Sequence, residues 1–142
     1  MLLIDVNVLV YAFRKESPGD DRYATWLESV LNGHEAYGVA DLVLSGFVRI
    51  VTHPRVFREP TSIERALAFC EQVRGRPHAV IVAPGARHWE IFRNLCRKVG
   101  ARGNVVPDAY LAALAIESGS EWITTDRGFG RFPGLRWRHP LD

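Results

Sequence analysis

The chain opens with LLIDVNVLVYAF, residues 2–13, in which a short apolar run ends at an acid and a helical pattern follows. The continuous apolar run at residues 2–4 is typical of a strand that is buried on both faces of a parallel sheet. The apolar residues of the second half recur at the spacing of one face of a helix. The stretch therefore predicts a strand–helix unit with Asp5 at its junction.

The same alternation continues along the rest of the chain. Apolar runs predict further strands at residues 37–40, 79–83 and 121–124, and an edge strand at 135–137. Strands that alternate with helices indicate βα units and a parallel sheet, and right-handed crossovers place helices on both of its faces. We expect an α/β fold, a three-layer α/β/α sandwich with a mostly parallel sheet of four to five strands, in one domain spanning residues 1–142. The helices expected between the strands have apolar faces within residues 8–13, 23–31, 44–51, 63–70, 89–99 and 107–118.

Polar residues and one proline predict where three of these helices begin. Asp41 is expected to cap the helix that follows the second strand. Thr61 and Glu64 match a capping box, with Thr61 as the N-cap. Pro107 is expected at the first position of its helix, where its missing N–H has no cost.

Composition excludes several classes of protein. The 142 residues are 47% hydrophobic and 24% charged, which argues against disorder and coiled coils. No apolar run approaches the roughly 18 residues of a membrane span, and the N-terminus lacks the basic start of a signal peptide.

Cys70 and Cys96 fall on apolar helix faces and are expected to be buried free thiols, so we expect a cytoplasmic protein. Trp26 and Trp89 are expected in the core.

The charge balance permits nucleic-acid binding without requiring it. Eighteen basic residues against sixteen acidic ones give a net charge of +2. Basic residues gather within residues 49–58 and 93–102, where they would either contact phosphates or form a solvated surface. No residue is assigned to RNA binding from the sequence.

Three aspartates from distant segments are expected at one edge of the sheet. Asp5 follows the first strand, Asp126 lies two residues after the fourth, and Asp108 lies in the first turn of the helix near Pro107. Ligands of open parallel sheets bind beyond the carboxyl ends of the strands. Each acid alone is better explained as a turn residue, a helix cap or a complement to the helix dipole, so the inference depends on their convergence.

Converging carboxylates repel one another unless a cation or a proton compensates them. Mg²⁺ and Mn²⁺ prefer such oxygen ligands and can activate a water against a phosphodiester. The sequence therefore predicts a metal site at Asp5, Asp108 and Asp126, the expected catalytic residues. Supporting roles are expected for Asn7, Asn104 and Thr124, although each of these three is equally compatible with a purely structural role.

Four segments give the chain a resemblance to a known family. They are IDVNVL at residues 4–9, FVRIVTHPRVF at 47–57, PDAYLAALA at 107–115 and TTDRGF at 124–129. With these motifs in this order, the chain resembles the PIN-domain ribonucleases, and within them the VapC-type toxins of toxin–antitoxin pairs. The resemblance implies an endoribonuclease that uses Mg²⁺ or Mn²⁺ and cleaves RNA, often tRNA or ribosomal RNA. It also implies a VapB-type antitoxin that covers the site, and a toxin homodimer.

One departure from that family pattern keeps alternatives open. Many members carry a glutamate in the helix after the second strand, where this chain has Ser45 and Gly46. A second metal site is therefore in doubt, and a catalytically degenerate module that binds RNA or a partner is the main alternative. A phosphatase with a nucleophilic Asp5 is the other, although Asn7 stands where that chemistry usually has a second acid.

Overall fold

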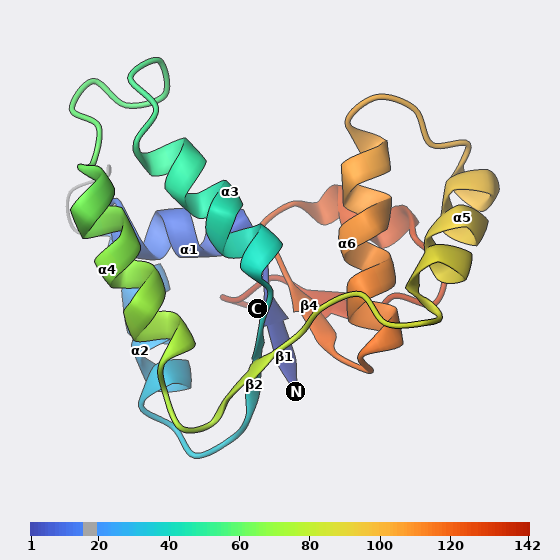
Figure 1. Ribbon diagram of the computed structural model, residues 1–142, viewed down its shortest axis with the longest axis horizontal. Helices are drawn as coiled ribbons and strands as arrows, with labels where there is room; N and C mark the ends of the chain where they lie inside the picture. Colours follow the sequence, from blue (N-terminus) through green and yellow to red (C-terminus); the bar gives the residue numbers. More distant parts are fainter. Residues whose placement is uncertain (16–19) are drawn as a thin grey trace.

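The computed structural model describes residues 1–15 and 20–142, and it is built around one five-stranded sheet (Figure 1). All of the strand pairings are parallel, and the strand order is β3-β2-β1-β4-β5. The predicted α/β class and all five predicted strands are confirmed, most of them shorter than expected. The strands are β1 (Leu2–Ile4), β2 (Tyr37–Val39), β3 (Ala79–Ile81), β4 (Glu121–Ile123) and β5 (Trp137–Arg138).

Helices cover both faces of this sheet, as expected from right-handed crossovers. Figure 1 shows α1 to α4 on one side of the strands and α5 with α6 on the other. The expected three-layer sandwich is therefore confirmed. The helices are α1 (Val6–Phe13), α2 (Arg22–Leu31), α3 (Asp41–Val51), α4 (Ile63–Arg74), α5 (His88–Val99) and α6 (Val105–Glu117), with a short 3-10 helix η1 (Arg127–Arg131) before β5.

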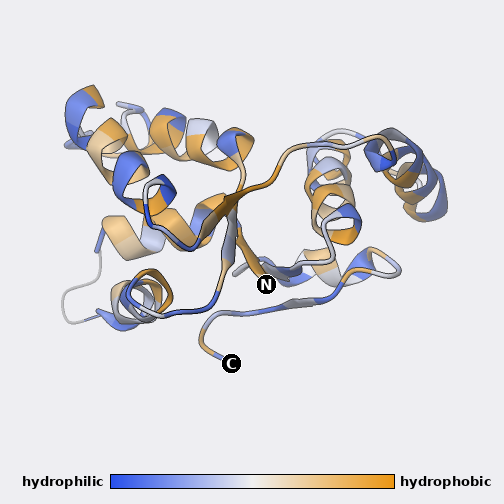
Figure 2. Ribbon diagram, turned by 60° about the horizontal axis from the view of Figure 1, so that its bottom comes forward, coloured by the Kyte–Doolittle hydropathy of each residue, from blue (hydrophilic) through white to orange (hydrophobic). Residues whose placement is uncertain are grey.

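The core lies between the sheet and the helices packed on it. Apolar colour concentrates on α6, whereas α5 is hydrophilic over much of its outer surface (Figure 2). Leu3, Phe47 and Trp122 are completely buried. None of the helices described is long and apolar enough to cross a bilayer.

Two core predictions fail because α5 is the outermost helix of its layer. Trp89, expected in the core, is 66% exposed on α5. Cys96, on the same helix, is only half-buried, whereas Cys70 is buried as expected and both thiols are free. Trp26 is partly buried and packs against the core.

The predicted helix starts are each displaced by one or two residues. Ser62, not Thr61, is the N-cap of α4, and its side chain accepts a hydrogen bond from the Arg65 N–H. The Thr61 hydroxyl instead accepts from the Arg14 guanidinium. The Thr61 side chain, predicted to cap its own helix, therefore links the start of α4 to the end of α1 by a hydrogen bond.

The starts of α3 and α6 differ from expectation for similar reasons. Ala40 is the N-cap of α3, and Asp41, the first helical residue, pairs with Arg74 of α4 at 2.9 Å. Helix α6 begins at Val105, so Pro107 is its third residue. Pro107 is tolerated there because the first four N–H groups of a helix have no partner within it.

Candidate active site

The three predicted aspartates meet where the direction of the strand order changes. Strands β1 and β4 are neighbours, yet the chain leaves β1 toward β2 and β3 and returns to β4 on the other side. Parallel sheets open a crevice at such a point, beyond the carboxyl ends of the strands. Asp5 ends β1, and Thr124 to Asp126 follow β4 directly. Asp108 approaches from the first turn of α6.

These aspartates line one hollow of about 420 Å³ between α1, the end of α3 and η1. Asp5 is 6% exposed at its floor, Asp108 is half-buried and Asp126 is exposed at the rim. The remaining wall is mostly apolar and includes Tyr11 of α1 and Phe57 of the loop after α3. The hollow is open to solvent, as a site for a large substrate must be.

A hydrogen-bond network fixes the carboxylate of Asp5. Its Oδ1 accepts from the Val6 N–H at 2.7 Å, which also makes Asp5 the N-cap of α1. Its Oδ2 accepts from the Thr124 hydroxyl at 2.7 Å and from the Asn7 side-chain amide at 3.1 Å. Asp5 therefore acts as an acceptor in all of these bonds, as an ionised carboxylate does.

Thr124 and Asn7 join the two strand ends. The Thr124 hydroxyl accepts from the Asp126 N–H at 3.0 Å while it donates to Asp5. The Asn7 Oδ1 accepts from the Thr125 N–H at 3.2 Å. The structure thus brings both of these expected supporting residues to the site. Asn104 is exposed at the start of α6 and does not line the hollow.

Burial and mutual repulsion raise the proton affinity of the site. Removal from water raises the pKa of Asp5 to about 6, and the negative charges of Asp108 and Asp126 add to this effect. Burial, and then the charge of Asp126, also raises the pKa of Asp108, which nearby Arg131 partly offsets. The aspartates therefore lie close enough to interact, and a bound cation would relieve their repulsion.

The oxygen atoms available fit a hard cation that keeps part of its water shell. Among the described residues, no three His, Cys, Asp or Glu side chains are arranged to enclose a metal ion. Mg²⁺ requires less, because it is usually held by one or two carboxylates together with several waters. Asp5 has one lone pair of Oδ1 left, and Asp108 makes no hydrogen bond with the described residues. Asp126 uses Oδ1 to accept from the Gly128 N–H and keeps Oδ2 available.

Gly128 leaves room for this arrangement around Asp126. A Cβ at position 128 would lie 2.9 Å from both Asp126 Oδ1 and Arg131 Nη2. Arg131 donates from its Nε to the Gly128 carbonyl at 2.8 Å. Arg131, the last residue of η1, is a neighbour of the site that sequence reasoning missed: it lies five residues after Asp126, and its charge acts on Asp108.

No acid occupies the place of the missing glutamate. Gly46 packs over Val6, and the neighbouring hollow of about 490 Å³ between α3 and α6 is lined by apolar side chains with Ser45 and Arg49. Val6 lines both this hollow and the one that holds the carboxylates. Among the residues that line these two hollows, the carboxylates therefore lie on only one side of Val6.

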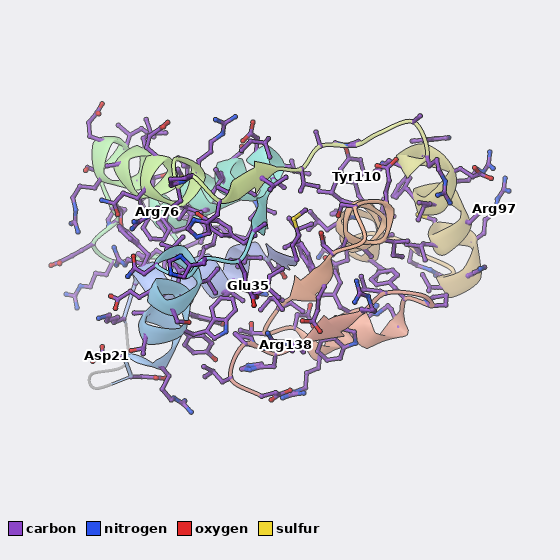
Figure 3. All side chains as sticks on the ribbon, turned by 90° about the horizontal axis from the view of Figure 1, so that it is seen from below. Asp21, Glu35, Arg76, Arg97, Tyr110 and Arg138 are labelled. Carbon is purple, nitrogen blue, oxygen red and sulfur yellow. The ribbon has the colours of Figure 1, made fainter. Side chains whose placement is uncertain are left out.

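A larger hollow of about 680 Å³ lies at the opposite ends of β1 and β2. Figure 3 views this region from below, with Glu35 and Arg138 near one another in the middle of the view. Both line the hollow, and Arg138 pairs with Glu121 at 3.0 Å. None of the three aspartates reaches it, so its size alone does not make it the site.

Comparison with known proteins shows the family of this chain. The sequence model of the PIN domain matches residues 2–135. The chain is 49% identical to "VapC ribonuclease Mb2897" of Mycobacterium bovis, over the whole chain and 97% of that protein. It is 37% identical to "Ribonuclease VapC25" of Mycobacterium tuberculosis, over 99% of both chains.

Solved structures share the fold at low sequence identity. VapBC2 from Rickettsia felis, bound to a promoter DNA fragment, matches with a TM-score of 0.72 at 20% identity, over 97% of both chains. The toxin VapC20 of Mycobacterium tuberculosis, described as cleaving the sarcin–ricin loop, matches with a TM-score of 0.61 at 17% identity. That match covers 96% of this chain and 99% of VapC20. The chain belongs to the PIN-domain family, among the relatives of the VapC ribonucleases.

Proposed function

We propose that this protein is a divalent-metal-dependent endoribonuclease that acts as the toxin of a toxin–antitoxin pair. The observation that carries the proposal is the convergence of Asp5, Asp108 and Asp126 on one open hollow at the carboxyl ends of β1 and β4. Relatives named as ribonucleases favour RNA hydrolysis over a phosphoenzyme mechanism on Asp5.

The three aspartates would hold Mg²⁺, with Mn²⁺ as an alternative. Such an ion, when bound, lowers the pKa of a water molecule and neutralises charge that develops on a phosphodiester. Thr124 and Asn7 hold the Asp5 carboxylate in one orientation through their hydrogen bonds to Oδ2. Arg131 lowers the negative potential beside Asp108, where the RNA phosphate must approach. No histidine is needed as a general base in this scheme.

The substrate we propose is tRNA or ribosomal RNA. One fold relative, VapC20, is described as cleaving the sarcin–ricin loop, an RNA target. The hollow is compatible with this choice because it is open to solvent and the carboxylates line it.

The partner we propose is a VapB-type antitoxin. Several structural relatives were solved as toxin–antitoxin complexes, including VapBC2 from Rickettsia felis and VapBC-1 from nontypeable Haemophilus influenzae. Pairing of two toxin chains and a cytoplasmic location stay predictions, which the mass of the purified protein and cell fractionation would test.

Cleavage of total cellular RNA tests the proposed activity. Purified protein freed of antitoxin should produce discrete fragments with Mg²⁺ or Mn²⁺ and none with EDTA. Asp108→Asn should abolish cleavage without unfolding the chain, since Asp108 makes no hydrogen bond with the described residues. Glu90→Gln, an exposed change on α5, is the matched control and should cleave like the unchanged protein.

A second candidate function is favoured by the acid-free surroundings of Gly46. A degenerate module would bind RNA or a partner without cutting. Folded protein that binds Mn²⁺ yet cleaves no RNA under any of these conditions would favour that module and contradict the nuclease.

A further inference from the structure

A second, smaller hollow adjoins the carboxylates. It measures about 140 Å³. Its walls combine aromatic and apolar side chains with two cations and one acid: Val10, Tyr11, Arg14, Lys15, Asp20, Tyr23 and Phe57. Three of these residues, Val10, Tyr11 and Phe57, also line the hollow that holds the aspartates. The two hollows therefore adjoin, and a path from the carboxylates to the smaller one runs along α1.

The exposed face of α1 sets the direction and length of this path. Asn7, Tyr11 and Arg14 recur at spacings of four and three residues, which places them on one side of the helix. With a rise of about 1.5 Å per residue, the path from Asp5 to Arg14 extends about 13 Å. A strand whose phosphate lies at the carboxylates would therefore pass Tyr11 next.

The size and chemistry of the small hollow suit one planar ring. A cavity of about 150 Å³ is known to hold a single benzene ring. Tyr11 is 48% exposed, and its ring centroid lies 5.3 Å from that of Tyr23. An exposed aromatic face beside a cationic side chain is the arrangement on which unpaired bases stack.

Arg14 fixes the opposite wall. Its guanidinium lies 4.1 Å from the centroid of the Phe57 ring. It also donates to the Glu59 carbonyl at 2.7 Å and to the Thr61 hydroxyl at 3.1 Å. The loop that carries Phe57 is thus held against α1, so the ring-sized space is part of the folded structure.

We propose that this hollow is a nucleobase subsite, in which an unpaired base next to the cleaved phosphodiester stacks on Tyr11. The proposal rests on the ribonuclease function and adds to it the place where the neighbouring base binds. A peptide segment is the less suited occupant, because a space for one ring cannot take the several side chains of a helical face.

Binding of short RNA to the Asp108→Asn protein tests this subsite without requiring cleavage. The probes are a fluorescent oligoadenylate, an oligouridylate, and a strand of the same length that carries the ribose phosphates without bases. Anisotropy in Mg²⁺ gives the dissociation constants. Tyr11→Ala should weaken binding of the base-bearing strands at least about fivefold, the lower end for loss of one stack. It should leave the abasic strand unchanged.

Two further variants make the comparison specific. Tyr11→Phe keeps the ring and should bind like the parent protein. Trp89→Ala removes an aromatic side chain that is 66% exposed on α5, and should also bind like the parent.

Three results would overturn the proposal. In the first, the parent protein binds base-bearing and abasic strands equally well. In the second, Tyr11→Ala weakens the binding of both kinds of strand equally. In the third, Tyr11→Ala weakens the binding of the antitoxin but not of any RNA strand. Failure of the ribonuclease function is a separate result, because it is measured as absence of RNA cleavage by the unchanged protein.

Discussion

Thr124 shows how much of the site a single side chain organises. Its hydroxyl donates to Asp5 and accepts from the Asp126 N–H, so it couples two of the three acids. The sequence indicated Thr124 and Asn7 from their places beside Asp5 and Asp126. It could not indicate which atoms bond, since that depends on the register between β1 and β4. Asn104, at the start of α6, is exposed and does not line the hollow, so of its two expected roles the structure favours the one in the loop.

Thr124→Val should weaken metal-dependent cleavage by about 10- to 100-fold, the usual effect of removing a group that orients a metal ligand. Valine has nearly the same shape as threonine but leaves the Asp126 N–H without its acceptor. It also removes the hydrogen bond from the Thr124 hydroxyl that lowers the pKa of Asp5. Initial rates of RNA cleavage over a Mg²⁺ titration measure the effect. Thr124→Ser keeps the hydroxyl and should cleave normally, and equal rates for Val and Ser variants would contradict this role.

Helix starts were less predictable than the helices themselves. Periodic apolar residues indicated six helices, and all six are present among the described residues. Whether a polar side chain caps its helix depends on the other partners that it binds. The Thr61 hydroxyl accepts a hydrogen bond from Arg14, and the Asp41 carboxylate pairs with Arg74. Both arginines lie far from their partners in the sequence. A local motif cannot reveal such competition.

Ser62→Ala should destabilise the protein by about 1 kcal/mol, the ordinary effect of losing an N-cap side chain. Its hydroxyl accepts from the Arg65 N–H at the start of α4. Urea unfolding followed by circular dichroism measures the change. Ser29→Ala, inside α2, is the matched control and should leave the stability within about 0.5 kcal/mol of the parent. A loss of the same size in both variants would argue against the assigned cap.

Topology explains why distant aspartates could be assigned from sequence whereas the neighbouring hollows could not. Parallel strands place all of their carboxyl ends at one edge, so Asp5 and Asp126 were expected at the same edge once the strands were identified. The pairing of β1 with β4, which makes them neighbours, is seen only in the structure. Phe57 lies in the loop between α3 and α4, which has no periodic pattern. Phe57 contacts the Arg14 guanidinium and lines both hollows together with Tyr11, an arrangement that is visible only in three dimensions.

The buried carboxylate of Asp5 should make the stability of the metal-free protein depend on pH. Its pKa rises from 3.8 to about 6 in the folded state, so the protonated form favours folding. This stabilisation is fully present at low pH and is lost as the pH rises through 6, a change of up to about 3 kcal/mol.

Urea unfolding in EDTA on either side of pH 6 measures this dependence. The Asp5→Asn protein is the control, since it lacks the titrating group and should not share that part of the pH dependence. Identical pH profiles for the two proteins would contradict the burial of an ionisable Asp5. Metal affinity should follow the opposite trend and increase with pH, because the ion binds the deprotonated carboxylates.

Calorimetric titration with Mn²⁺ tests most directly whether the three aspartates form one metal centre. We predict that the unchanged protein and the Glu90→Gln control bind the ion alike. Asp108→Asn should weaken binding at least about tenfold, since the loss of even an outer partner of a metal ligand has that effect. Equal affinity of the Asp108→Asn protein and its parent would contradict the metal centre, and with it the mechanism proposed for RNA cleavage.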